Sequence, residues 1–127
     1  MDLSIKSIED VVTVSRRVQQ FCLERGVSQR GAYLSGLAME EMAGNVVSHG
    51  FTLDNKPHNL TARAIVKDED VILCIKDDCQ PFDPVQWQNI TNPEDKTKNI
   101  GLRMIYKIAK DFTYQNILGL NVLTIKL

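Results

Sequence analysis

The sequence predicts a single α/β domain, residues 1–127, in which helices cover one face of a mostly antiparallel, mixed sheet. Three observations support this fold class. The length of 127 residues suits one domain with a single core. Segments rich in β-branched residues occur as two pairs, each joined by a short turn, which is typical of hairpins. Segments with apolar residues at helical spacing lie between them and predict the order β-α-α-β-β-loop-α-β-β.

The first half of the chain is predicted to form a strand and two helices. Apolar and polar residues alternate over residues 3–5, as in a short strand. A helix of residues 7–25 begins with a Ser-x-x-Asp capping box. A second helix is expected from about residue 28 to 49, where Gly50 ends it, and a polar loop that contains Pro57 follows.

The second half is predicted to form two hairpins around one helix. The runs "LTARAIVK" and "VILCIK" are separated by three acidic residues, and "FTYQ" and "NVLTIKL" are joined across Gly119. Between the hairpins, "IGLRMIYKIAKDF" has helical spacing. The polar stretch "WQNITNPEDKTKN" shows no periodicity and is expected to be a loop.

Composition excludes several classes of function. The formal net charge is −1 and the basic residues are scattered, so we expect no nucleic-acid partner. No apolar run approaches the roughly 20 residues of a membrane span, and no signal-peptide profile is present, so we expect a cytoplasmic protein without membrane insertion. Cys22, Cys74 and Cys79 form no recognisable zinc pattern with His49 and His58. Cys22 and Cys74 are expected to be reduced core thiols.

The second helix carries two polar side chains on a face that should be buried. In "MEEMAGNVVSHGF", Glu41 and Asn45 are one helical turn apart and continue the line that begins at Leu34. A buried carboxylate without a partner is costly or takes up a proton. The pair therefore indicates a cleft. From this segment alone, a solvated Glu and an Asn at a helix end are an equally good interpretation.

Two further segments favour a ligand site. Asp77 has the same parity as Leu73 and Ile75 and is expected to face the packed side of the sheet, where it can accept a hydrogen bond from an exocyclic amine. In "NIGLRMI", Gly101 opens a helix whose first amide groups suit a phosphate.

These three segments together resemble the ATP-binding domain of the GHKL superfamily, and most closely the stand-alone domains of bacterial anti-sigma-factor serine kinases. "EEMAGNVVSHGF" is similar to the family's N box, "DDCQPFDP" to its Asp box, and "IGLRMIYKIAKDFTYQNILGLNVLTIKL" to its last glycine box and final hairpin. The nucleotide-binding positions that the resemblance implies are Asn45, His49, Asp77, Cys79, Pro81, Phe82, Ile100, Gly101, Leu102 and Thr124.

The resemblance implies a two-layer α/β sandwich, the Bergerat fold, with ATP between helices and sheet. By the same resemblance, Asn45 would hold Mg²⁺ and Glu41 would be the general base. Asp77 would bind the adenine amino group, with help from Thr124. Mg²⁺ takes oxygen ligands, and phosphoryl transfer requires mainly positioning and charge neutralisation.

The sequence departs from the family pattern at several places. Cys79 replaces the first glycine of the Asp box, so the turn there cannot depend on a glycine-only conformation. The segment "KTKNIGL" is short of glycines, and its Lys96 and Lys98 are either phosphate contacts or solvated loop lysines. If Thr124 faces the nucleotide, Leu123 faces the other side of the sheet, which would then be covered by a first strand or by a homodimer partner.

The leading functional hypothesis is a Mg-ATP-dependent protein serine/threonine kinase that phosphorylates a small antagonist protein and sequesters a sigma factor. One alternative is a nucleotide-dependent binding or regulatory module with little catalysis. Another is the ATP-binding domain of a histidine kinase, which is disfavoured because no helical pair with a phospho-accepting histidine precedes it.

Overall fold

The part of the chain that the structure describes forms helices and strands in the predicted order. This computed structural model describes residues 1–51, 57–81 and 100–127, without the side chains of 100–102. The elements are β1 (Asp2–Ile5), α1 (Ile8–Glu24), α2 (Gln29–Asn45), η1 (Val46–Gly50), β2 (Leu60–Lys67), β3 (Asp70–Asp77), α4 (Ile100–Ile108), β4 (Asp111–Ile117) and β5 (Leu120–Lys126).

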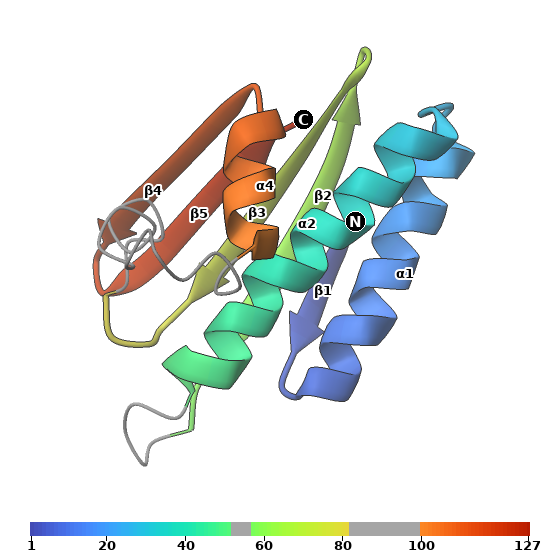
Figure 1. Cartoon of the computed structure of the whole chain (residues 1–127). Helices are drawn as coiled ribbons and strands as arrows, with labels where there is room; N and C mark the ends of the chain where they lie inside the picture. Colours follow the sequence, from blue (N-terminus) through green and yellow to red (C-terminus); the bar gives the residue numbers. More distant parts are fainter. Residues whose placement is uncertain (52–56, 82–99) are drawn as a thin grey trace.

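The five strands form one sheet in the order β1-β2-β3-β5-β4 (Figure 1). The prediction of a mostly antiparallel sheet is confirmed, and all four pairings between the described strands are antiparallel. Leu60 pairs with Asp77, and Asp77 pairs in turn with Asn121. The first residue of β2, the last of β3 and a residue near the start of β5 therefore lie side by side at one end of the sheet.

The helices α1, α2 and α4 lie on one face of this sheet, which confirms the two-layer architecture (Figure 1). Helix α1 begins at Ser7, whose Oγ accepts a hydrogen bond from Asp10 N at 3.3 Å. Its contact with α2 is close, because Ser15 Oγ donates to Gly36 O at 2.8 Å. A Cβ atom at Gly36 would lie 3.0 Å from Ser15 O, so glycine permits this approach.

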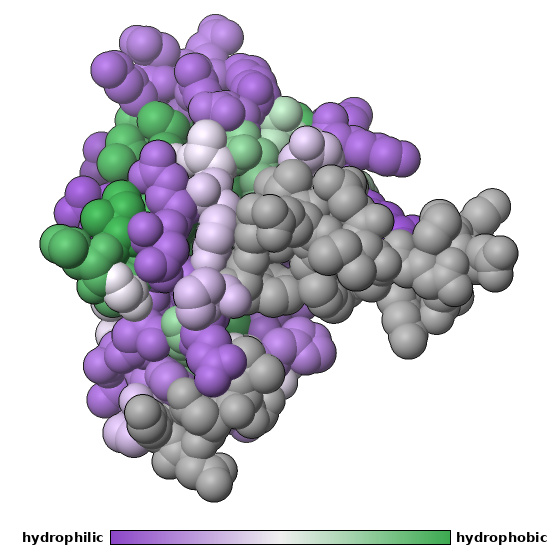
Figure 2. Space-filling model, turned by 90° about the vertical axis from the view of Figure 1, so that its left-hand side faces the viewer, coloured by the Kyte–Doolittle hydropathy of each residue, from purple (hydrophilic) through white to green (hydrophobic). Residues whose placement is uncertain are grey.

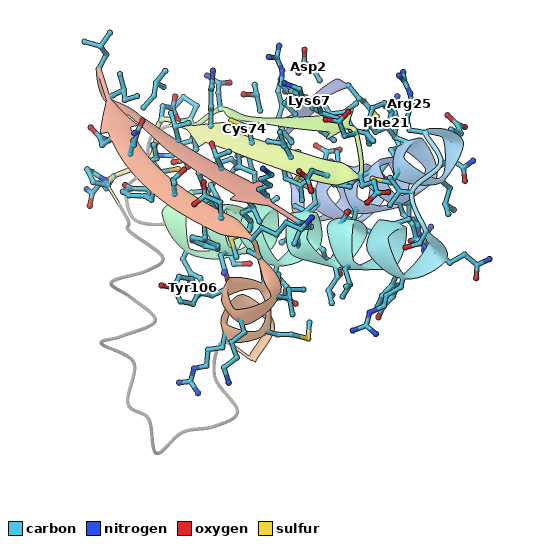
Figure 3. The ribbon with its side chains drawn as sticks, turned by 90° about the horizontal axis from the view of Figure 1, so that it is seen from above. Asp2, Phe21, Arg25, Lys67, Cys74 and Tyr106 are labelled. Carbon is cyan, nitrogen blue, oxygen red and sulfur yellow. The ribbon has the colours of Figure 1, made fainter. Side chains whose placement is uncertain are left out.

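The core lies between the helices and the sheet, and every second residue of the central strands faces it. On β5 these residues include Leu123 and Ile125, which removes the reason for expecting a covered back face. Cys22 is buried in the core, as predicted. Cys74 is only half-buried and lies on the side of the sheet away from the helices (Figure 3), so the prediction of a core thiol is wrong there.

The turn between β4 and β5 is unusually apolar for an exposed segment. Leu118 and Gly119 both have positive φ, as a two-residue type I′ hairpin turn requires. Leu118 is 98% exposed, and Ile117 and Leu120 are also exposed. Figure 2 looks onto the side of the molecule that carries β4 and shows a hydrophobic area bordered by hydrophilic side chains. Within residues 1–51, 57–81 and 100–127, no helix combines the length and apolar character needed to cross a membrane.

Candidate nucleotide site

A pocket lies between the C-terminal end of the α2–η1 helix and the strands β3 and β5. The enclosed cavity has a volume of about 50 Å³, and the atom-free space around it, which includes open solvent, brings the total to about 560 Å³. Hydrophobic side chains form most of the wall, and polar groups lie on both the helix side and the sheet side. The lining residues are Met42, Asn45, Val46, His49, Gly50, Ile75, Asp77, Cys79, Gln80, Tyr114, Asn121 and Leu123.

Asp77 provides the carboxylate on the sheet side of this pocket. It is the last residue of β3 and only 7% exposed, so its predicted orientation toward the helices is confirmed. Its Oδ1 accepts hydrogen bonds from Cys79 N at 3.0 Å and from Asn121 Nδ2 at 2.9 Å. Among the described residues, none donates a hydrogen bond to Oδ2. A buried carboxylate oxygen that receives no hydrogen bond from those residues favours a ligand that brings its own donor.

Asn121 is a site residue that the sequence analysis missed. It is the direct cross-strand neighbour of Asp77 and is 4% exposed. Besides Asp77, its Nδ2 donates to the carbonyl oxygens of Cys79, at 3.0 Å, and Gln80, at 3.3 Å. It thereby ties the turn after β3 to β5. The signal was present in the sequence, since Asn121 has the parity of the core residue Leu123.

Two residues of β4 support the other end of the Asn121 carboxamide. Its Oδ1 accepts hydrogen bonds from Tyr114 OH and from Asn116 Nδ2, the latter at 3.0 Å. With donors at one end and acceptors at the other, the carboxamide has one favourable orientation. This network holds the oxygen atoms of Asp77 in place.

The helix side of the pocket is formed where α2 changes into a π-helical turn. Asn45 is the last α-helical residue and His49 lies in η1, and both line the pocket. Phe51 N donates to Val46 O at 3.0 Å, which is the i→i+5 bond of a π-helix. Gly50 lies against Cys79: a Cβ atom there would be 3.0 Å from Cys79 Sγ. Glycine at this position therefore serves close packing.

Glu41 lies one turn before Asn45 on α2 and is half-buried, but it does not line the pocket. Burial raises the pKa of its carboxyl group above the ordinary value, and the charge of neighbouring Glu40 raises it further. A raised pKa makes Glu41 a stronger base than an ordinary glutamate. Glu41 and Asn45 lie on the same side of the helix, the side that faces the pocket at Asn45.

The remaining predicted residues lie in different places. Pro81 is exposed and does not line the pocket, and Phe82 lies outside the described residues. Residues 100–102, which include the predicted Ile100, Gly101 and Leu102, form the first turn of α4, but their side chains are outside the description. The predicted loop lysines are likewise outside it.

Thr124 lies on the face of the sheet opposite the pocket. It pairs with Cys74 across β3 and β5, and both point away from the helices, with Thr124 Oγ1 4.0 Å from Cys74 Sγ. The expectation that Thr124 helps to bind adenine is therefore corrected. The physical reason is the two-residue period of a strand: Thr124 is three residues from Asn121 and so faces the other side.

The chemistry of the pocket fits a purine nucleotide with a metal ion. Ile75, Leu123 and Val46 offer apolar surface to a flat ring, and Asp77 offers an acceptor to an exocyclic amine. Asn45, on the opposite wall, offers a carboxamide oxygen, which is a ligand type that Mg²⁺ accepts. The residues present can thus hold both groups.

The fold is a two-layer α/β sandwich with a pocket between its helices and its antiparallel sheet. The family model described as the histidine kinase-like ATPase domain matches residues 6–127, so the chain belongs to this family, a GHKL-type ATP-binding domain. Membership implies the use of ATP.

Solved structures with the same fold include two of one histidine kinase. The histidine kinase domain of the Erythrobacter litoralis EL346 blue-light activated histidine kinase aligns with a TM-score of 0.60 and 18% identity over 80% of this chain and 48% of that chain. A structure of the blue-light activated histidine kinase itself gives 0.59 and 18%, over 80% of this chain and 31% of that chain. The chain thus spans less than half of either, and these similarities concern the fold. No curated protein sequence matches the chain.

Proposed function

We propose that the chain binds Mg-ATP in this pocket and transfers the γ-phosphoryl group to a serine or threonine of a protein partner, as the anti-sigma-factor kinases that it resembles do. The observation that supports this most is the arrangement of Asn45 and Asp77 on opposite walls of one largely apolar pocket. The partner in this proposal is a small antagonist protein, with a sigma factor as the protein whose availability is regulated.

Each polar residue has one role in the proposal. Asp77 Oδ2 accepts a hydrogen bond from the exocyclic amine of adenine, while Oδ1 keeps its bonds within the protein. Asn45 provides an oxygen ligand for Mg²⁺, which neutralises phosphate charge when bound. Glu41 takes the proton of the acceptor hydroxyl as that oxygen bonds to the γ-phosphorus and the bond from phosphorus to the β–γ bridging oxygen breaks. Its raised pKa suits this role.

Nucleotide binding is tested by calorimetric titration of Mg-ATP into the wild type and Asp77→Asn. The variant keeps an Oδ1 acceptor for Cys79 N and Asn121 Nδ2 but replaces Oδ2 with an NH₂ group. Loss of a hydrogen bond to a charged acceptor, about 1.5–3 kcal/mol, predicts roughly 10- to 150-fold weaker binding. Asp111→Asn, a charge-matched change at an exposed position of β4, should leave the affinity within about threefold. Equal affinities for wild type and Asp77→Asn would contradict the adenine assignment.

Phosphoryl transfer is tested separately with Glu41→Ala and labelled ATP. The expected result is loss of transfer to the partner with nucleotide affinity changed by less than about fivefold, because Glu41 does not line the pocket. Glu40→Ala is the matched control, since it removes an exposed carboxylate from the next position of α2. Transfer that survives in Glu41→Ala would show that another group is the base.

A nucleotide-dependent binding module without transfer is the second candidate. It is favoured by the position of Glu41 outside the pocket lining. In that case calorimetry would detect Mg-ATP binding, mass spectrometry would detect no phosphorylated partner, and partner affinity would still change between ATP and ADP. The ATP-binding domain of a histidine-kinase-type signalling protein is compatible with the same pocket and would instead transfer phosphate to a histidine.

A further inference from the structure

Three potential metal ligands of different chemistry meet beside the pocket, although they show no zinc spacing in the sequence. His58 lies two residues before β2, and Asp78 and Cys79 directly follow β3. The antiparallel register, in which Leu60 pairs with Asp77, brings position 58 next to the turn after β3. One imidazole nitrogen, one carboxylate oxygen and the thiol sulfur all lie within 4.8 Å of one another.

The arrangement is held by contacts that do not involve a metal. Asp78 Oδ1 accepts hydrogen bonds from Asn59 N at 3.0 Å and is 3.1 Å from His58 Nδ1. Phe51 stacks on the His58 ring, with centroids 5.9 Å apart and an interplanar angle of 27°. The His58 side chain is 6% exposed, whereas the Asp78 side chain is 35% exposed. The imidazole is therefore fixed, and the carboxylate provides access from solvent.

Cys79 completes the cluster from a buried position. Its backbone N–H is bonded to Asp77, and its side chain touches Gly50 at the end of η1. The thiol is thus held by two elements of the fold. Because Cys79 also lines the nucleotide pocket, the cluster shares one wall with that pocket.

The distances approach those of a tetrahedral zinc site. Zn–N and Zn–O bonds of about 2.0–2.1 Å place those two ligand atoms about 3.3 Å apart, close to the 3.1 Å between His58 Nδ1 and Asp78 Oδ1. A Zn–S bond of about 2.3 Å requires the sulfur at about 3.6 Å from each, so Cys79 Sγ needs a shift on the order of 1 Å.

We propose that His58, Asp78 and Cys79 bind a zinc-type divalent cation, with three protein ligands and a fourth position open to solvent. Mixed nitrogen, oxygen and sulfur ligands select a borderline-soft ion such as Zn²⁺ over Mg²⁺, which takes oxygen ligands. The site is thus chemically distinct from the Mg²⁺ position proposed at Asn45. Ion binding releases the thiol proton of Cys79 to solvent, and the imidazole proton that His58 Nδ1 donates to Asp78 moves to Nε2, so that the neutral ring binds through Nδ1.

The test uses Co²⁺ as a spectroscopic substitute for Zn²⁺ on the nucleotide-free full chain. The wild type should bind one Co²⁺ with a near-ultraviolet thiolate charge-transfer band and tetrahedral visible bands, and Zn²⁺ should remove both. Cys79→Ser should lose the thiolate band and at least roughly 100-fold in affinity, more than the 10–100-fold typical of losing a partner outside the ligand set. Cys74→Ser is the matched control, because that thiol lies on the other face of the sheet, and it should keep the band unchanged.

A second readout guards against a variant that fails to fold. In the wild type, free Zn²⁺ at a hundredfold excess over its dissociation constant should raise the melting temperature by roughly 5–10 °C. Asp78→Asn leaves the buried His58 and Cys79 in place and should abolish this rise. A thiolate band that persists in Cys79→Ser, or one that disappears in Cys74→Ser, would overturn the proposal, as would a wild type that binds no Co²⁺. Since no nucleotide is present, failure here is independent of whether the chain binds ATP.

Discussion

Replacement of Asn121 by alanine removes only a small side chain, yet it should destabilise the protein strongly. The carboxamide is buried and donates to Asp77 Oδ1 and to the carbonyl oxygen of Cys79, at 2.9 and 3.0 Å. It also accepts hydrogen bonds from Tyr114 and Asn116. Alanine removes all of these bonds at once.

The magnitude follows from the two buried bonds. A hydrogen bond to a charged group contributes about 1.5–3 kcal/mol and a neutral one about 0.5–1.5 kcal/mol, so the loss to Asp77 and Cys79 is about 2–4.5 kcal/mol. The partners on β4 are half exposed or exposed, and water can replace those bonds. With roughly 2.1 cal/mol/K of unfolding entropy per residue, a chain of 127 residues loses roughly 7–17 °C in melting temperature.

The measurement is urea denaturation followed by far-ultraviolet circular dichroism, with the m-value checked for constancy. Asn116→Ala is the matched control, because it removes one exposed carboxamide from the same network. We expect it to lose less than about 1 kcal/mol. If Asn121→Ala is no less stable than Asn116→Ala, the network does not hold the turn after β3.

Three further changes test the site by their effect on stability. Glu41→Gln should be more stable than the wild type near pH 8 and equally stable near pH 4. Burial raises the pKa of Glu41, so the wild type loses stability as the pH rises through that pKa. Denaturation at both pH values measures the difference in stability. Gly50→Ala should lower the free energy of unfolding by about 1–3 kcal/mol, because the added Cβ atom meets Cys79. Gly44→Ala should raise it by up to about 1 kcal/mol in the same assay, because no other residue lies within 4 Å of the added Cβ atom. Asn121→Asp should be less stable near pH 8 than near pH 5, since it places two carboxylates together; a pH-independent effect would contradict this.

The orientation of Asp77 could be predicted from the sequence, whereas the role of Thr124 could not. Parity predicts the orientation of Asp77, because alternation along a strand is fixed by backbone geometry. The family motif predicts a nucleotide contact for Thr124 from its residue type, whereas strand parity puts Thr124 on the opposite face. Asn121 satisfies the parity and the hydrogen bonding together. Parity is the stronger criterion because a strand cannot turn one side chain over without a bulge.

The cluster of His58, Asp78 and Cys79 could not be predicted from spacing along the chain. Zinc patterns are recognised because their ligands lie a few residues apart, but here an antiparallel pairing brings together positions twenty residues apart. The register of β2 with β3 decides this contact, and no single residue in either strand specifies it. The half-buried position of Cys74, in contrast, follows from parity, because Cys74 lies between Leu73 and Ile75, which face the helices.

The π-helical turn at Val46–Gly50 makes chain length at this point as important as chemistry. A π-turn accommodates one residue more than the α-helix would hold. Deleting one residue there would replace the wide turn with a regular α-helical turn. The close approach of Gly50 to Cys79 belongs to the wide turn, so this part of the pocket wall would change even though every polar group of the site was still encoded.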